Sequence, residues 1–286
     1  MDRREFLTAV TAGTAGAAGA LGTVSGLAAC VRGPTQGARR LDKIGVQLYT
    51  VRSEMAKGVE ATLDRVAAIG YQEVEFAGYF DRTPEQIRAA LAATGLSAPA
   101  AHVPFERIES GWSATLDEAT RAGHDTVIVA WIPEERRRTL DEVRACAALF
   151  NQAGEAAKGA GLRYAYHNHD FEFPRIEGQV PYDVLLAETD PALVAFELDL
   201  FWVTNGGGDP LAYFASHPGR FPLVHVKDRD AQGRMVDVGA GRTDFAGIFA
   251  RAEQAGIRHY FVEHDEPAEP FASIEASYQY LRRLEF

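Results

Sequence analysis

Four short apolar runs in the second half of the chain end in residues that can bind a metal ion or move a proton. These residues are His167 and His169 after the first run, Asp199 in the second, His225 in the third and Glu263 in the fourth. Imidazole nitrogens and carboxylate oxygens together suit Mn²⁺, Zn²⁺, Co²⁺ or Fe²⁺ better than Ca²⁺, which prefers oxygen ligands alone. The pattern predicts one divalent metal ion, provided that the fold brings the four runs together.

Strand alternation places further polar residues beside this group. Side chains two positions apart share a strand face, so Glu197 is expected with Asp199, and Lys227 with His225. Two carboxylates on one inward face are costly unless they share a cation or a proton. The neighbours therefore strengthen the expectation of a charged centre at these strand ends.

An alternation of strands and helices is the arrangement that must position these residues. A closed (β/α)8 barrel is predicted, because in that fold the C-terminal ends of all strands converge on one mouth. A doubly wound sheet is the alternative, but the segment after Tyr49 lacks the glycine-rich turn that it usually carries. The eight expected strands lie at 44–49, 73–76, 98–103, 125–131, 162–167, 194–199, 222–226 and 259–264.

Helix signals separate the expected strands. Thr83 is the expected N-cap of a helix over 84–94, with Pro84 at its first position and Gly95 at its end. Thr243 is expected to cap a single helix over 245–255 by the same reasoning.

The first 30 residues are typical of an export signal. Arg3 and Arg4 precede a weakly apolar stretch that ends Leu-Ala-Ala-Cys, a pattern similar to the bacterial lipobox. The expected organisation is a cleavable twin-arginine signal at 1–30, a linker at 31–42 and one barrel domain at 43–286. The mature protein is expected in the periplasm or cell envelope, with a lipid on Cys30 as its only membrane contact.

Charge and cysteine content narrow the possible partners. The chain of 286 residues has a net charge of −11, which the loss of residues 1–29 leaves unchanged. An acidic surface repels phosphate backbones, so a nucleic-acid partner is not expected. Cys146 would be the one cysteine after Cys30, so no internal disulfide can form, and we expect it to be buried as a small hydrophobic side chain.

Six segments resemble the xylose-isomerase-like barrels, a superfamily of sugar isomerases and epimerases, inosose dehydratase and endonuclease IV relatives. The resemblance covers about residues 43–286 and is carried by 44–50, 166–170, 198–202, 225–228, 239–245 and 262–263. In the epimerase members, a Glu, an Asp, a His and a Glu from strands five to eight hold one metal ion. The resemblance thus implies His167, Asp199, His225 and Glu263 as the ligands here.

His167 departs from that pattern, because the epimerases have a glutamate at this place. They use their two glutamates as an acid and base pair, so a plain two-base epimerisation is not expected in this chain. The His-Asn-His and Asp-Leu-Phe-Trp segments look more like those of exported relatives that cleave keto-glycosides by elimination and hydration.

The chemistry implied is removal of a proton next to a carbonyl that a metal ion polarises. The resulting enediolate leads to isomerisation, epimerisation or elimination and hydration of a sugar or keto-sugar. The expected catalytic residues are His102, His169, Lys227 and Glu263. The expected substrate-binding residues are Glu75, Trp202 and Glu197.

Two glycine-rich segments bear on the substrate, at 206–208 and 239–241. They could cradle a phosphate but lack clustered basic residues, so a neutral sugar or glycoside is expected instead. Two other classes stay open: a surface-tethered carbohydrate-binding barrel without chemistry, and an endonuclease IV-like nuclease, which the acidic charge and the export signal oppose.

Overall fold

The computed structural model describes residues 38–286. The expected export signal at 1–30, with Cys30, and most of the linker lie outside the described residues. The described chain is already fixed to the barrel before residue 43, because the backbone N–H and C=O of Arg39 pair with those of Phe286 at 2.9 and 3.0 Å. Among the described helices, none is both long and apolar enough to cross a membrane.

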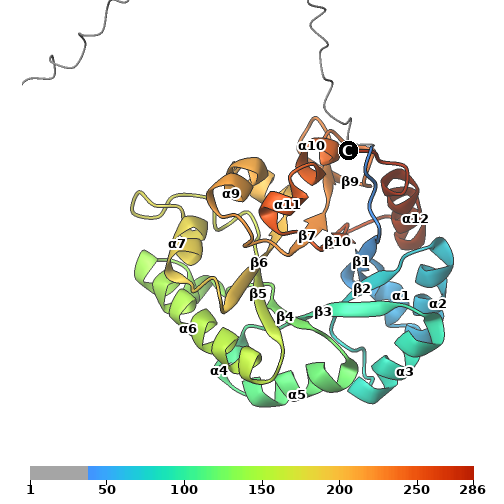
Figure 1. Ribbon diagram of the computed structural model, residues 1–286, viewed down its shortest axis with the longest axis horizontal. Helices are drawn as coiled ribbons and strands as arrows, with labels where there is room; N and C mark the ends of the chain where they lie inside the picture. The colour runs from blue at the N-terminus through green and yellow to red at the C-terminus, as the bar shows by residue number, and fades with distance from the viewer. Residues whose placement is uncertain (1–37) are drawn as a thin grey trace, which may run out of the picture. The chain divides into compact units, whose positions relative to one another are not determined.

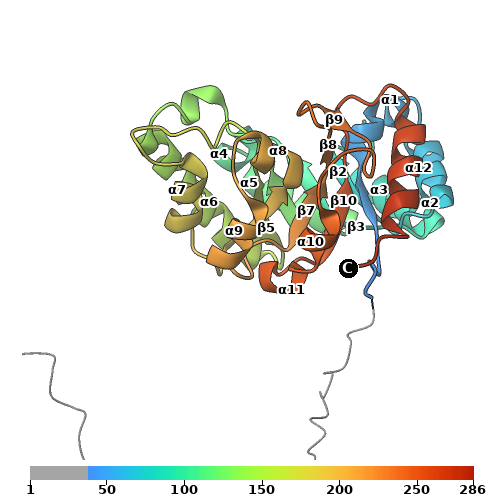
Figure 2. The ribbon, with the colours of Figure 1, turned by 90° about the horizontal axis from the view of Figure 1, so that it is seen from above.

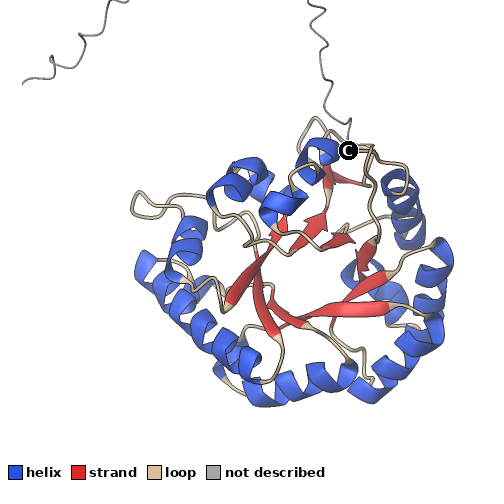
Figure 3. Cartoon of the chain, viewed as in Figure 1, coloured by secondary structure: helices blue, strands red, loops and turns tan. Residues whose placement is uncertain are grey.

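Eight parallel strands close into a barrel in the order β1-β10-β7-β6-β5-β4-β3-β2, which confirms the predicted fold (Figures 1 and 3). The strands are β1 (Gly45–Gln47), β2 (Glu73–Ala77), β3 (Ser97–Val103), β4 (Thr126–Val129), β5 (Arg163–His167), β6 (Val194–Asp199), β7 (Leu223–Val226) and β10 (His259–Val262). Two further short strands, β8 (Asp228–Arg229) and β9 (Met235–Val236), form an antiparallel hairpin after β7. In Figure 2 this hairpin and the short helix after β6 lie toward one end of the barrel, and the C-terminus lies toward the other.

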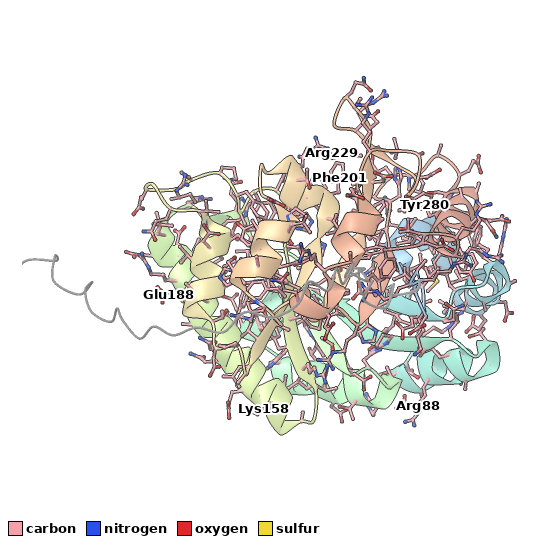
Figure 4. The ribbon with its side chains drawn as sticks, turned by 45° about the horizontal axis from the view of Figure 1, so that its top comes forward. Arg88, Lys158, Glu188, Phe201, Arg229 and Tyr280 are labelled. Atoms are coloured by element: carbon pink, nitrogen blue, oxygen red, sulfur yellow. The ribbon has the colours of Figure 1, made fainter. Side chains whose placement is uncertain are left out.

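Helices surround the strands as an outer layer (Figure 1). They are α1 (Arg52–Met55), α2 (Val59–Ile69), α3 (Pro84–Thr94), α4 (Glu106–Glu109), α5 (Trp112–Ala122), α6 (Leu140–Gly159), α7 (Pro181–Glu188), α8 (Leu200–Asn205), α9 (Pro210–Ser216), α10 (Phe245–Phe249), α11 (Ala252–Ala255) and α12 (Pro270–Leu281), with 3-10 turns at Leu48–Val51 and Glu134–Arg136. Side chains fill the layer between strands and helices (Figure 4).

The helix boundaries predicted from the sequence are confirmed for α3 and are wrong for the helical segment after β7. Thr83 caps α3, Pro84 opens it and Gly95 ends it in the left-handed conformation, as predicted. The prediction of one helix over 245–255 capped by Thr243 was wrong. Asp244 is the cap, and the segment forms α10 and α11 with a break at Arg251, where ψ rises to 8°. Thr243 instead belongs to the loop around Asp228, to which its N–H donates, and the side chain of Asp244 accepts the N–H of Gly247 as the cap.

The barrel interior has an apolar floor directly beneath polar positions. The floor consists of Ala100, Ile128, Ala165, Leu223 and Phe261. The residue two positions after each floor residue points inward as well, and these residues form the next layer of the interior. They are His102, Ala130, His167, His225 and Glu263. Because parallel strands share one direction, this layer lies toward the C-terminal mouth.

Helix α6 fits closely against the start of β6, and this contact can be tested. A Cβ on Gly154 would lie 2.5 Å from the backbone oxygen of Leu193, which cannot rotate away. We expect Gly154→Ala to lower the free energy of unfolding by about 1–3 kcal/mol through overpacking. The measurement is urea denaturation followed by circular dichroism.

Gly159→Ala is the matched control in the same helix, since nothing lies within 4 Å of its added Cβ. It should be neutral or stabilise the protein by up to about 1 kcal/mol through helix propensity. Equal effects of the two substitutions would contradict the contact.

Candidate metal centre and active site

His225 on β7 lies at the centre of the polar layer and faces carboxylates from both of its ring nitrogens. Its Nε2 lies 2.7 Å from Glu75 Oε2, in hydrogen-bonding geometry, and 3.2 Å from Glu197 Oε2. Its Nδ1 lies 2.6 Å from Glu263 Oε2 and 3.7 Å from Asp199 Oδ2 but makes no hydrogen bond to either. Nε2 therefore donates to Glu75, while Nδ1 faces the carboxylate oxygens of Asp199 and Glu263, which are also potential metal ligands.

The upper set, defined as His167, Asp199, His225 and Glu263, is the group predicted to hold the metal ion. Each of the four offers one donor atom, these atoms lie within 4.8 Å of one another, and all four residues are buried. A ring nitrogen of His167 lies 3.3 Å from Asp199 Oδ2. Two nitrogens and two carboxylate oxygens at this spacing fit a divalent transition metal.

Asp199 is oriented by its backbone surroundings. Its Oδ1 caps α8 by accepting the N–H groups of Phe201 and Trp202 at 2.9 and 2.8 Å. Its own N–H donates to the side chain of Asn168 at 3.0 Å. With Oδ1 occupied, Oδ2 is left to face the upper set, as a preoriented ligand must.

The lower set, defined as Glu75, His102 and Glu197, lies on the Nε2 side of His225, and the His102 ring stacks beside the His225 ring at 5.3 Å between centroids. His102 Nε2 contacts Glu197 Oε2 at 2.8 Å and Glu75 Oε2 at 3.1 Å. Together with His225 these residues also offer four donor atoms within 4.8 Å. They are joined by hydrogen bonds from His102 to Glu197 and from His225 to Glu75, whereas the upper set has one internal hydrogen bond, between His167 and Asp199.

The placement of Glu75 and Glu197 does not support the direct substrate contact expected from the sequence. Both side chains are fully buried, and neither lines the cavity at the mouth. The charge problem of two inward carboxylates is solved by His102. Burial by itself lowers the pKa of His102, but Glu75 and Glu197 outweigh it and raise that pKa to about 9. His102 is therefore cationic at neutral pH.

Lys227 is surrounded by three carboxylates. Its Nζ lies 3.0 Å from Asp199 Oδ2, 2.8 Å from Glu263 Oε2 and 2.7 Å from Asp265 Oδ1. Burial opposes its charge, but Asp199 and Glu263 outweigh burial and hold the pKa of Lys227 above its usual range. These carboxylates thus hold Lys227 as a cation, and its expected role as a proton shuttle stays a prediction.

A cavity of about 520 Å³ opens above the upper set, a size typical of small-molecule sites. Its lining includes His102, His167, His169, Trp202, Lys227 and Glu263, which the sequence had singled out. The lining also includes Tyr49, Ala77, Ala130, Trp131, Asp170, Phe171, Asp265 and Glu266, which it had not. Trp131 could have been found, because it is the last residue of the expected fourth strand at 125–131.

His169 lies in the loop after β5, since that strand ends at His167. Its ring is 5.0 Å from the His167 ring and 5.7 Å from Trp202, between centroids. Its Nδ1 has no hydrogen-bond partner. Burial, and then the nearby His167, hold the pKa of His169 well below its usual value. His169 is therefore a neutral imidazole in the cavity wall.

Glu172 fixes the loop that carries His169. One of its carboxylate oxygens accepts the hydroxyl of Tyr166, and the other accepts the backbone N–H of His169 at 2.9 Å. Burial raises the pKa of Glu172 to about 7. This carboxyl group is thus a structural element whose charge state changes near neutral pH.

The glycine-rich segment at 239–241 has a structural role. The carboxylate of Asp228 accepts the backbone N–H groups of Gly239 and Gly241 at 2.9 Å and that of Thr243 at 3.0 Å. These amides are therefore not free to bind a phosphate. Among the described residues that line the cavity, Lys227 is the one lysine or arginine, against four carboxylates. The described lining of the cavity is thus mainly acidic.

The chain belongs to the family described as Xylose isomerase-like TIM barrel, which matches residues 63–284. Within this class it is similar to an inosose dehydratase from Lacticaseibacillus casei, with 22% identity over 272 residues that cover 80% of this chain and 91% of the relative. The barrel is thus of the sugar isomerase, epimerase and dehydratase type.

Solved structures agree with this placement. A sugar phosphate isomerase/epimerase from Parabacteroides distasonis has 29% identity and a TM-score of 0.76, over 84% of this chain and 98% of that one. The IOLI protein, solved with a zinc atom, shares the fold at 14% identity and a TM-score of 0.67, over 83% of this chain and 95% of that one.

The upper set predicts how metal binding responds to substitution. Asp199→Ala and His225→Ala should each abolish stoichiometric Zn²⁺ or Mn²⁺ binding, because each removes one donor of four. Glu75→Gln should weaken binding by about 10- to 100-fold, since it loosens the hold on His225 Nε2. Elemental analysis and titration calorimetry would measure both effects.

Asp141→Ala is the control for that experiment, because this carboxylate side chain is 94% exposed on α6. It should bind metal like the unchanged protein. Undiminished binding by Asp199→Ala and His225→Ala would rule out the upper set as the metal site.

Glu172 predicts a pH-dependent difference in stability. A raised pKa means that folding favours the protonated form of Glu172. The stabilising contribution of this protonated carboxyl is complete below about pH 4.5 and is lost as pH rises through about 7. Glu172→Gln removes the ionisable group. Its amide oxygen can still accept the N–H of His169, and its NH2 group can donate to the hydroxyl of Tyr166. The free energy of unfolding of Glu172→Gln minus that of the unchanged protein should therefore increase by on the order of 3 kcal/mol from pH 4 to pH 8.

Urea denaturation at pH 4, 6 and 8 would measure this gain. The control is Glu155→Gln on the exposed face of α6, which should follow the unchanged protein at every pH. A constant difference between Glu172→Gln and the unchanged protein would show that Glu172 does not titrate in this range.

Proposed function

We propose that this protein is a divalent-metal-dependent enzyme that removes a proton next to the carbonyl of a neutral keto-sugar or keto-glycoside and then eliminates a substituent from the neighbouring carbon. The observation that carries the proposal is the convergence of the upper set, with its donor atoms within 4.8 Å of one another beneath a cavity. The similarity to a dehydratase that is named for inosose, itself a keto-compound, supports this reaction class.

The upper set fits a bound cation by its own geometry. His225 Nδ1 and Glu263 Oε2 are buried and 2.6 Å apart, and Glu263 Oε2 is also paired with the cationic Nζ of Lys227 at 2.8 Å. A divalent cation held there would supply a Lewis acid that polarises the substrate carbonyl and stabilises the enediolate left by proton removal. Mn²⁺, Zn²⁺, Co²⁺ and Fe²⁺ all suit this donor set.

His169 is the proposed base. It lines the cavity, it is outside the upper set, and its Nδ1 is unpaired. The carbon-bound proton passes to the imidazole, the electron pair of the broken bond moves toward the carbonyl, and collapse of that charge expels the substituent at the β-carbon. Lys227, fixed among carboxylates, balances charge rather than carrying a proton.

A single base fits elimination better than epimerisation. Two-base inversion at a carbon uses a base that removes the proton on one face and an acid that returns a proton on the other face. The second glutamate of the epimerases is replaced by His167, which belongs to the upper set. The lower set is proposed to position His225, with Glu75 accepting its Nε2 proton and His102 neutralising Glu75 and Glu197.

The site gives less support to the other two classes. The unpaired imidazole and the upper set favour chemistry over carbohydrate binding alone, and the carboxylates in the cavity lining oppose a nuclease. We also propose, from the twin-arginine and lipobox-like pattern, that the protein is exported to the periplasm or cell envelope and anchored through Cys30.

Turnover of a panel of sugars would test the proposed function. Keto-glycosides, free keto-sugars, their unoxidised forms and sugar phosphates would be assayed with and without a chelator. We expect activity on neutral keto-compounds alone, its loss with the chelator, and recovery with Mn²⁺, Zn²⁺ or Co²⁺. His169→Gln should lower kcat by roughly 100- to 10,000-fold with metal content unchanged.

His217→Gln is the matched control, because this histidine lies at the end of α9 and outside the cavity lining. It should retain full activity. Activity that survives complete metal removal, or a His169→Gln protein with normal kcat, would refute the mechanism.

A further inference from the structure

An exposed tryptophan lies at the lip of the cavity. Trp131, directly after β4, is 48% exposed, and the other large apolar side chains exposed to this extent in residues 38–286 are Tyr49 and Leu211. Trp131 and Tyr49 line the cavity, whereas Leu211 lies on α9. The exposed aromatic surface is therefore concentrated at the mouth.

Trp131 is held rigidly although it is exposed. Its ring meets Phe171 edge-to-face at 4.7 Å and His169 at 4.9 Å, between centroids. The guanidinium of Arg137 lies 3.7 Å from the centre of the Phe171 ring and 5.5 Å from that of Trp131. Arg137 is itself fixed, since its Nε donates to the carbonyl of Ile132 at 2.9 Å. A ring held this way loses little entropy when a ligand covers it.

Trp131 is separated from the upper set by one imidazole. The ring of His169 lies 5.0 Å from that of His167 on one side and 4.9 Å from Trp131 on the other. A sugar ring whose carbonyl reaches the upper set would therefore occupy the space beside His169. A second ring, joined to the first through one bridging oxygen, would lie over Trp131.

We propose that Trp131, Phe171 and Arg137 form a subsite for the second ring of a glycoside, which is the leaving group of the elimination. This inference rests on the proposed function and narrows its substrate class to glycosides with a ring-bearing aglycone, either a second sugar or an aryl group. Both present an apolar face, and indole binds such faces while its edge stays solvated. In the elimination, the bond from the β-carbon to the bridging oxygen breaks, and this oxygen leaves with the second ring and takes a proton from solvent water, while His169 keeps the proton removed from the α-carbon.

The surroundings of Trp131 favour a small ligand over a protein partner. The same mouth carries the carboxylates of Asp170, Asp265 and Glu266, so the apolar surface ends at the cavity rim. A protein interface needs a much broader apolar patch than one indole ring and its neighbours. The patch is instead continuous with the proposed active site.

Binding and kinetics with paired ligands would test the subsite in the metal-loaded protein. The binding probes are methyl and 4-nitrophenyl glucosides, both anomers, and cellobiose, measured by titration calorimetry. The ring-bearing probes should bind about tenfold more tightly than methyl glucoside. Trp131→Ala should remove that difference, Trp131→Phe should retain most of it, and Leu211→Ala should not change it.

Kinetics on the matching keto-glycosides separate this inference from the proposed function. Trp131→Ala should raise KM about tenfold for the 4-nitrophenyl keto-glycoside and leave KM for the methyl one unchanged. Turnover with equal KM values for both substrates, unaffected by Trp131→Ala, would overturn the subsite while the proposed function stands. A tenfold binding preference that depends on Trp131, without turnover of any keto-compound, would support the subsite as a ring-binding site and overturn the proposed chemistry.

Discussion

The two-sided environment of His225 is the constraint on which the site depends. One nitrogen of the ring is held by Glu75 and Glu197 from beneath, and the other faces Asp199 and Glu263 above. A histidine ligand is most effective when its second nitrogen donates to a carboxylate, because this fixes both the tautomer and the ring direction. The lower set is therefore best understood as the support of the upper set.

The register between neighbouring strands of the barrel brings these carboxylates to His225. Adjacent parallel strands place Glu197 beside Leu223 and Asp199 beside His225. Glu197, like Glu75, is therefore fully enclosed, whereas His102, His167 and Glu263 reach the cavity. Small alanines in the floor leave room for the single large Phe261, and a Cβ on Gly45 would lie 2.5 Å from that ring. The packing below the site thus fixes the height of the ligands above it.

Much of this architecture could be predicted because the barrel repeats a simple pattern. Every expected strand is present, and the four expected ligands of the upper set come together, since each follows a short apolar run at the same end of a strand. Cys146 is buried, as its place in an apolar helix face indicated.

Depth within the barrel could not be predicted from the sequence. Alternation shows that Glu75 and Glu197 point inward, but strand stagger decides that they lie beneath the cavity instead of lining it. Loop contacts were also hidden, because the partner of Thr243 is Asp228, 15 residues earlier in the chain. Helix α5 follows Gly111, which offers no side-chain cap, and so it lacked a start signal.

Buried carboxylates outside the upper set have a common role that bears on the substrate. Glu172 fixes the loop with His169, and Asp228 fixes the loop at 239–243, each by accepting backbone N–H groups. Backbone amides at a barrel mouth could otherwise bind an anionic ligand. Because the protein's own carboxylates already occupy these donors, a phosphorylated substrate would have to displace a buried negative charge in order to bind there. A neutral ligand meets no such penalty, and this difference supports the proposal of an uncharged substrate.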